Sequence, residues 1–191
     1  MILEGAFTLP VASVQAWNLL LDPGALRRCI PGCASLERVD ATHYRGQVVN
    51  EVAHIRFNAS FNAELVLVEP YQRVQAVLKG EDRRLSSSLR VDVTLVVEEM
   101  TQSEATEEGI TPAQGRSSRI QYYMDVALWG KIGRLGEPIF RRRMTEVESQ
   151  FVHAVIGECS IGLGYETTRA TSAPIQHSER ADGSIDRADR K

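Results

Sequence analysis

The sequence predicts an α+β fold in which a curved antiparallel sheet of about seven strands wraps around one long C-terminal helix. Two short helices are expected after the first strand. Apolar and polar residues alternate along several segments before residue 130, which is the period of a half-buried strand. After residue 130 the apolar spacing becomes helical. Because the strands follow one another through short connections, we expect them to pair antiparallel.

The first strand is expected over residues 2–9, where apolar residues recur at alternate positions. Residues 11–21 then place apolar side chains on one face of a short helix, with Ser13 as a candidate N-cap. An Asp-Pro-Gly sequence breaks this helix, and residues 25–30 are expected to form one more helical turn.

Six further strands are expected, and the second of the long ones has the clearest signal. From Ile55 onward every second residue is apolar, and the residues between them are mostly polar. Ala53-His54 is the predicted turn of the hairpin that leads into this strand. The predicted strands cover residues 34–40, 43–52, 55–68, 73–81, 89–98 and 120–128.

The long helix is predicted from an apolar stripe, with an irregular start before Pro138. Charged and polar residues between the stripe positions, Glu148 among them, are expected to lie off the stripe. Residues 99–116 are polar and are expected to form a loop. The stripe consists of Phe140, Met144, Val147, Phe151 and Val155.

Composition places the chain among ordinary globular proteins. Apolar residues make up 43% and charged residues 25% of the 191 residues. The net charge of -3 predicts no nucleic-acid partner. The N-terminus lacks the pattern of a signal peptide and no apolar run is of membrane-spanning length, so we expect a cytoplasmic protein. One domain is predicted over residues 1–163, followed by a disordered polar tail over 164–191.

Several segments resemble the CoxG family, whose members accompany carbon monoxide dehydrogenase. The first is Glu4-Gly5-Ala6-Phe7-Thr8-Leu9-Pro10, and the most specific is Cys29-Ile30-Pro31-Gly32-Cys33, which follows a Leu-Asp-Pro turn. Residues 130–136 are similar to the family's entry into the last helix, where Phe151 stands at an aromatic position. The resemblance covers residues 1 to about 160. The sequence departs from it at Ala53-His54, where the family commonly has a Gly-Pro turn.

The resemblance implies a helix-grip fold of the START-like (SRPBCC) superfamily, which encloses an apolar cavity between sheet and helix. It also implies a non-catalytic accessory protein of a molybdenum hydroxylase such as carbon monoxide dehydrogenase. Such a protein binds a quinone or lipid, has no cofactor of its own, and helps to bring the dehydrogenase to the membrane. Peripheral contact with the inner face of the membrane follows from this expectation, and a homodimer stays open.

The expected cavity lining combines the helical stripe with the apolar face of the strands. The alternative is that the same side chains form an ordinary filled core, since both arrangements need apolar residues. The candidate lining residues are Phe57, Phe61, Leu65, Leu78, Val93, Leu95, Met124, Val126, Phe140, Met144, Val147 and Phe151.

Two alternative functions remain from the sequence. An enzyme related to the aromatase/cyclases would use the same cavity and would need polar side chains inside it. The candidates are Asn58, Asn62, Tyr122 and Tyr123. A structural adaptor would have a filled core and no cavity. Fold-level analogy alone does not separate these functions.

Other groups of reactive or charged residues favour structural interpretations. Cys29 and Cys33 are expected to be packed thiols, because a structural zinc site needs four ligands and only one close pair is present. The run Arg141-Arg142-Arg143 is expected to be a solvated helix face balanced by Glu146 and Glu148. The histidines have no nucleophile at a readable spacing and are expected at the surface or satisfied.

Overall fold

The computed structural model describes residues 1–107, 109 and 116–169 of the chain. Within these residues the strands form one seven-stranded antiparallel sheet with the order β1-β7-β6-β5-β4-β3-β2. Every neighbouring pair except β1–β7 is consecutive in sequence, which confirms the predicted meander. The strands are β1 (Ile2–Leu9), β2 (Cys33–Arg38), β3 (His43–Val52), β4 (Ile55–Glu69), β5 (Arg73–Asp82), β6 (Ser87–Met100) and β7 (Ser117–Trp129).

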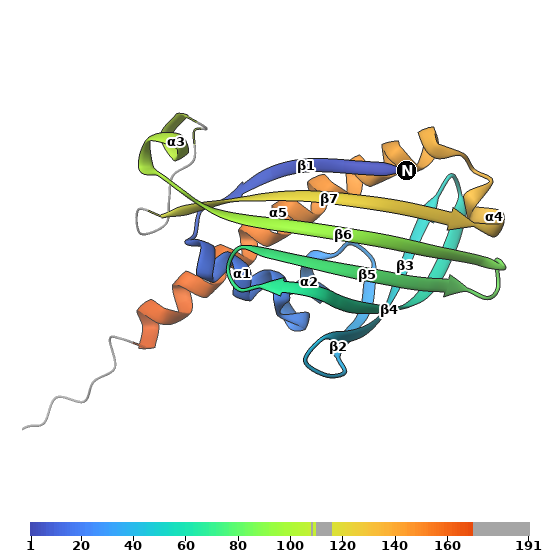
Figure 1. Cartoon of the computed structure of the whole chain (residues 1–191), viewed down its shortest axis with the longest axis horizontal. Helices are drawn as coiled ribbons and strands as arrows, with labels where there is room; N and C mark the ends of the chain where they lie inside the picture. The colour runs from blue at the N-terminus through green and yellow to red at the C-terminus, as the bar shows by residue number, and fades with distance from the viewer. Residues whose placement is uncertain (108, 110–115, 170–191) are drawn as a thin grey trace, which may run out of the picture.

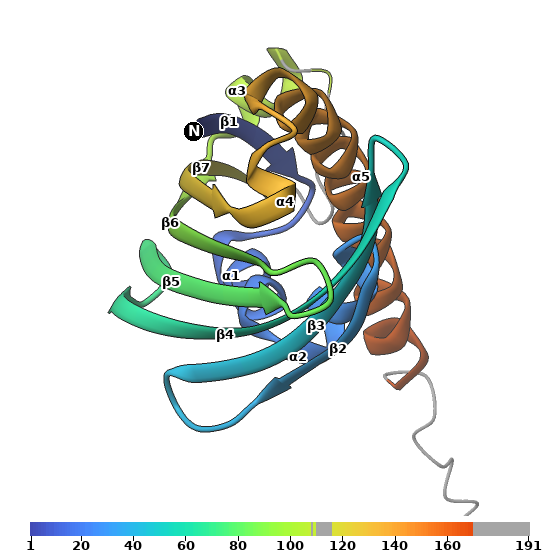
Figure 2. The ribbon, with the colours of Figure 1, turned by 90° about the vertical axis from the view of Figure 1, so that its right-hand side faces the viewer.

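Two short helices follow β1 as predicted, and one long helix ends the described part of the chain (Figure 1). The sheet curls from β1 round to β2, and the long helix α5 closes its open side (Figure 2). This arrangement confirms the predicted helix-grip fold class. The helices are α1 (Ser13–Leu21), α2 (Pro23–Cys29), α3 (Gln102–Glu107), α4 (Gly130–Gly133) and α5 (Glu137–Arg169).

One packed cluster of apolar side chains lies at the end of the sheet that α1 and α2 cover. It joins Leu9, Val97 and Ile120 of the sheet to Trp17 of α1 and Val155 of α5. All five are at most 7% exposed. Because burying an aliphatic or aromatic side chain stabilises the fold by about 1.5–3 kcal/mol, this cluster anchors α1 and α5 to the sheet.

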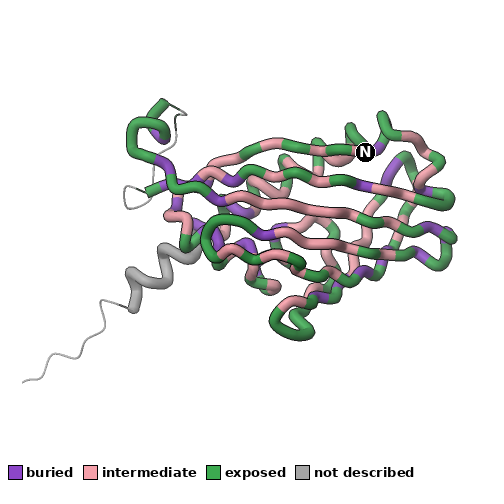
Figure 3. The backbone as a smooth tube through the Cα atoms, in the orientation of Figure 1, coloured by how far each residue is buried: buried purple, intermediate pink, exposed green. Residues whose placement is uncertain are grey.

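A second packed cluster lies at the opposite end of the sheet. It joins Val52 of β3 and Leu85 of the β5–β6 turn to Ile132 of α4 and Phe140 of α5. Between the two clusters the middle of the strands is half-buried, as the pink stretches of β5 and β6 show (Figure 3). The fold therefore packs tightly at its two ends and less tightly in between.

The structure corrects the sequence prediction at two places. The N-cap of α1 is Ala12, not Ser13, and the Ser13 amide donates to Glu99 Oε2 at 2.7 Å. The predicted loop over 99–116 contains the end of β6 and the helix α3, while residues 108 and 110–115 lie outside the described residues. The predicted irregular start of the long helix is confirmed, because α4 and α5 are separate.

The long helix reaches Arg169, beyond the predicted domain boundary at residue 163. Most of the predicted tail, residues 170–191, lies outside the described residues. The division into a domain and a disordered tail therefore stays a prediction.

Candidate ligand-binding interior

The face of the sheet that is turned toward α5, here called the inner face, is identified by an aromatic contact. The rings of Phe7 on β1 and Phe151 on α5 meet edge to face, with centroids 6.2 Å apart. The strand register then carries the inner face from Phe7 to Ile120 on β7 and Val97 on β6, which pair in turn. Because side chains alternate along a strand, every second residue of each strand belongs to this face.

The candidate lining residues on the strands all belong to the inner face. Leu78 pairs with Val91 and Ala63, and Val93 pairs with Met124, so these apolar side chains continue across β4, β5, β6 and β7. The prediction of which strand face is turned inward was therefore right. Whether the space in front of that face holds a ligand stays a prediction.

The twelve candidate residues divide into four groups by their packing. Phe57 and Phe140 pack in the cluster at the α4 end, and Leu65, Leu95 and Phe151 pack against the cluster at the α1 end. Phe61 and Val126 are 9% and 8% exposed. The remaining five belong to neither cluster and are only half-buried: Leu78, Val93, Met124, Met144 and Val147.

These five half-buried residues come from both sides of the interior. Leu78, Val93 and Met124 are on the sheet, and Met144 and Val147 are on α5. Side chains of a filled core are close-packed and lose nearly all contact with solvent. An apolar surface that stays partly accessible between two packed ends has the chemistry of a binding site for an apolar molecule.

One polar pair lies within this apolar interior. Tyr122 is on the inner face of β7, between Ile120 and Met124, and both it and Glu148 of α5 are half-buried. Burial raises the pKa of the Tyr122 phenol, and the hydrogen bond that its hydroxyl donates to the Glu148 carboxylate raises this pKa further. The prediction that Glu148 lies off the inward stripe is wrong.

Gly5 makes room for the Tyr122 ring. A Cβ atom at Gly5 would lie 2.5 Å from the Tyr122 hydroxyl and 2.8 Å from Cζ, which is closer than van der Waals contact allows. Gly5 and Tyr122 are also register partners on β1 and β7. The ring therefore lies over the backbone of β1, and its hydroxyl extends toward α5.

A second polar contact joins α5 to β3. Arg143 donates from Nη2 to Asn50 Oδ1 at 2.6 Å and from Nη1 to Glu146 Oε2 at 2.7 Å. Asn50 lies beside Gly32, whose carbonyl accepts a hydrogen bond from the Val49 amide at 2.8 Å. The Pro-Gly turn of the predicted signature thus packs on the part of β3 that holds Arg143.

Three of the four polar candidates for an enzyme site lie outside the interior. Asn58 and Asn62 are exposed on the outer face of β4, and Asn58 Oδ1 accepts from Gln47 Nε2 at 2.7 Å. Tyr123 is 43% exposed. Tyr122 is the one candidate of the four that the structure places inside. Glu148, its partner, was missed because a search for apolar periodicity assigns every carboxylate to the solvent side.

The three cysteines are free thiols. Cys29 is buried in the cluster at the α1 end together with Cys159 of α5, whereas Cys33 starts β2 and is half-buried. Burial raises the pKa of both Cys29 and Cys159 to about 11. The prediction that Cys29 and Cys33 are packed or surface thiols is consistent with these surroundings.

The three arginines of the run on α5 form ion pairs with neighbouring glutamates. Arg141 pairs with Glu137 at 2.6 Å, and Arg142 and Arg143 lie 4.0 Å and 2.7 Å from Glu146. The predicted balance is therefore correct in kind, with Glu137 in the place assigned to Glu148. Ion pairs of this exposed kind contribute little to stability.

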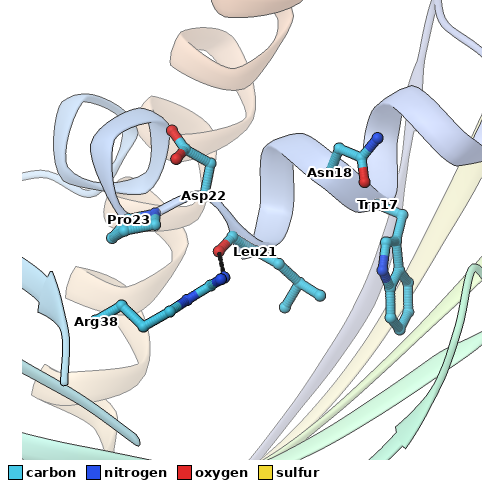
Figure 4. A pocket seen from close by; sticks show the side chains of 6 residues that line it. All are labelled: Trp17, Asn18, Leu21, Asp22, Pro23 and Arg38. Carbon is cyan, nitrogen blue, oxygen red and sulfur yellow. Dashed lines mark hydrogen bonds between the residues drawn. The ribbon is translucent and has the colours of Figure 1, made fainter. Parts of the chain in front are cut away.

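A pocket of about 600 Å³ lies where α1 meets α2. Figure 4 shows Arg38 reaching to the carbonyl of Leu21, to which Nη2 donates at 2.8 Å. Arg38 also donates to the Tyr44 hydroxyl, so its donors serve the fold. None of the twelve candidate residues lines this pocket, which is formed by Trp17, Asn18, Leu21, Asp22, Pro23 and Arg38.

Among the described residues, no three His, Cys, Asp or Glu side chains gather closely enough to hold a metal ion. In the same part of the chain, no helix combines the length and apolar character that a membrane crossing requires.

A curved sheet that grips a C-terminal helix around an apolar inner face defines a START-like helix-grip protein, and comparison with solved structures agrees. A conserved protein from Geobacillus kaustophilus matches with a TM-score of 0.69 at 18% identity, over 84% of this chain and 95% of that one. A START superfamily protein from Mycobacterium smegmatis matches with a TM-score of 0.59 at 11% identity, over 82% and 95%.

The Zhui aromatase/cyclase from Streptomyces sp. R1128 has a TM-score of 0.56 at 10% identity, over 84% of this chain and 93% of that one. At such identities these likenesses establish the fold alone. A search of curated proteins found no relative of the chain. The sequence profile of the carbon monoxide dehydrogenase CoxG family matches residues 5–156. The chain therefore belongs to the CoxG family.

Proposed function

We propose that this protein is a non-catalytic accessory protein of a molybdenum hydroxylase of the carbon monoxide dehydrogenase type. It binds an apolar molecule, a quinone or a lipid, between the sheet and α5. In that role it helps to bring the dehydrogenase to the cytoplasmic face of the membrane, where such ligands are found.

The observation that carries the proposal is the half-buried apolar interior between two packed clusters. Leu78, Val93 and Met124 on the inner face of the sheet, and Met144 and Val147 on α5, join neither cluster. Leaving so much apolar surface unpacked lowers the stability of the fold, since each buried methylene contributes about 0.8 kcal/mol. A ligand that covers this surface recovers the lost burial. Membership of the CoxG family supplies the dehydrogenase as the partner.

The proposal is tested on protein purified without detergent from its native host. Organic extraction followed by mass spectrometry is expected to recover a quinone or another lipid at a stoichiometry approaching one per chain. A carrier protein of similar size from the same cells, purified in parallel, controls for lipid carried over from the membrane. Recovery of no apolar molecule, together with no uptake of added quinone, contradicts the proposal.

An enzyme of the aromatase/cyclase kind is the second candidate, and one observation favours it. Tyr122 and Glu148 form a hydrogen-bonded polar pair inside the interior, where such an enzyme would need its acid or base. The other three polar candidates lie on the outer face, so none of them adds a polar group to this pair inside the interior. This leaves the binding function better supported.

A further inference from the structure

The polar pair inside the interior offers hydrogen-bond acceptors. Phe151 meets Phe7 of β1, and Glu148 lies one helical turn before Phe151 on α5. Gly5, two residues before Phe7, pairs with Tyr122, so the fold brings Glu148 next to the Tyr122 hydroxyl. Tyr122 uses its own proton in the hydrogen bond to Glu148, which leaves the phenol oxygen with free lone pairs. An ionised carboxylate is acceptor-only and has room for several hydrogen bonds on its two oxygens. A ligand group that binds beside this pair therefore meets oxygen atoms that accept hydrogen bonds and repel an anion.

Arg143, five residues before Glu148 on α5, does not offset the negative charge of the Glu148 carboxylate. Arg143 directs Nη1 to Glu146 and Nη2 to Asn50, so its terminal donors are used at the β3 side of the helix. Apolar residues of the stripe lie between Arg143 and Glu148 in sequence. The Tyr122–Glu148 pair is therefore an acceptor site within an apolar wall.

We infer that the interior selects ligands that carry a hydroxyl donor on an apolar body, such as a phenol, a hydroquinone or an alcohol, through Tyr122 and Glu148. This inference rests on the proposed binding function and names the chemical class of its ligand. A quinone carbonyl has no proton to donate, and a fatty acid brings a carboxylate against Glu148. The reduced form of a quinone is thus the better ligand of the two redox forms.

The experiment compares two probes that differ only in whether they can donate a hydrogen bond. 4-Hexylphenol can donate a hydrogen bond, whereas its methyl ether, 4-hexylanisole, has the same apolar body and no donor. Arg143 Nε is buried and has no hydrogen-bond partner among the described residues. Because the oxygen of either probe could accept a hydrogen bond from this atom, it does not favour one probe over the other. Titration calorimetry on the full-length protein is expected to show that the phenol binds about tenfold or more tightly, since a hydrogen bond to a charged acceptor is among the stronger ones.

Three variants locate the source of this preference. Glu148→Gln is expected to bring the ratio of the two affinities close to one, because an amide N–H can donate to the ether oxygen. Tyr122→Phe is expected to lower the ratio as well. Glu64→Gln removes the same charge from the exposed outer face of β4 and is expected to leave the ratio unchanged. Thermal unfolding of each variant verifies that it is folded.

The possible outcomes separate the two ideas. Equal affinity of the wild-type protein for both probes, or a preference that persists in the folded Glu148→Gln and Tyr122→Phe variants, overturns the inference while binding itself stands. Failure of both probes to bind the wild-type protein contradicts the proposed function, and the inference falls with it.

Discussion

Gly5 is needed at its position because the Tyr122 ring lies against it. An added Cβ would approach the hydroxyl and Cζ of that ring to 2.5 and 2.8 Å. Gly5→Ala is therefore expected to displace the ring, to lower the free energy of unfolding by about 1–3 kcal/mol, and to weaken discrimination between donor and non-donor ligands. Urea unfolding measures the first effect, and the paired probes measure the second.

Gly157 provides the matched control for this substitution. It is an exposed glycine within α5, and nothing lies within 4 Å of an added Cβ. Gly157→Ala is expected to raise the free energy of unfolding by about 0.5–1 kcal/mol, because glycine is a poor helix former. A Gly5→Ala variant as stable and as selective as the wild type would show that the ring tolerates the added methyl group.

The inner-face residues of the strands could be predicted from the sequence, whereas the inward position of Glu148 could not. Leu78, Val93 and Met124 were assigned to the inner face correctly, because period-two alternation fixes the side of a strand on which a residue lies. Glu148 was assigned to the solvent side, since a carboxylate breaks an apolar stripe. Its inward position depends on Tyr122, a residue of another element, and no local pattern contains that pairing.

At the scale of elements, the strands were predictable and the short helices less so. Each predicted strand overlaps an observed one, and the largest difference at an end is three residues, at Ser117. The helix α3 was missed because six residues give too little periodicity to recognise, although Ala105 is fully buried. The N-cap of α1 was assigned by residue type, whereas the Ser13 amide is satisfied by Glu99 from β6.

The β3–β4 turn offers a test of backbone energetics at this scale. Ala53 and His54 have φ of 48° and 64°, the left-handed values that a two-residue type I′ hairpin requires. Non-glycine residues other than Asn and Asp are unfavourable there. The double substitution Ala53→Asn with His54→Gly is expected to raise the free energy of unfolding by about 1 kcal/mol, as measured by urea denaturation.

Ala41→Gly in the neighbouring β2–β3 turn is the control for this substitution. Ala41 is exposed and is not among the residues with positive φ. A glycine there therefore relieves no backbone strain, and it increases the conformational entropy of the unfolded chain. Its stability is expected to stay equal to that of the wild type or to decrease. Equal effects at the two turns would contradict the assigned strain at Ala53 and His54.

At the scale of the whole molecule, the fold consists of two packed ends that are bridged by the sheet and by α5. The cluster with Leu9, Val97 and Val155 holds one end, and the cluster with Ile132 and Phe140 holds the other. The sequence predicted both the apolar sheet face and the apolar helix stripe. It could not predict the looser middle, because a filled core and a cavity wall need the same residue types.

Val93 and Val97 allow the cavity and the filled core to be distinguished by stability. Both are on β6, four residues apart and on the inner face, but Val93 is half-buried in the middle, while Val97 is 5% exposed within the cluster at the α1 end. Val97→Phe is expected to lower the free energy of unfolding by about 1–3 kcal/mol through overpacking. Val93→Phe is expected to leave it unchanged or to raise it, because the ring enters unfilled space.

The same two variants separate ligand binding from stability. Val93→Phe is expected to abolish uptake of 4-hexylphenol in titration calorimetry, since the ring occupies the volume that the ligand needs. Val97→Phe lies in the packed end and is expected to keep binding at temperatures where it remains folded. If Val93→Phe destabilises the protein as much as Val97→Phe does, the middle is already filled, and the structural adaptor becomes the better interpretation. A tolerated phenylalanine that blocks binding instead identifies the middle of β6 as the wall of a ligand cavity.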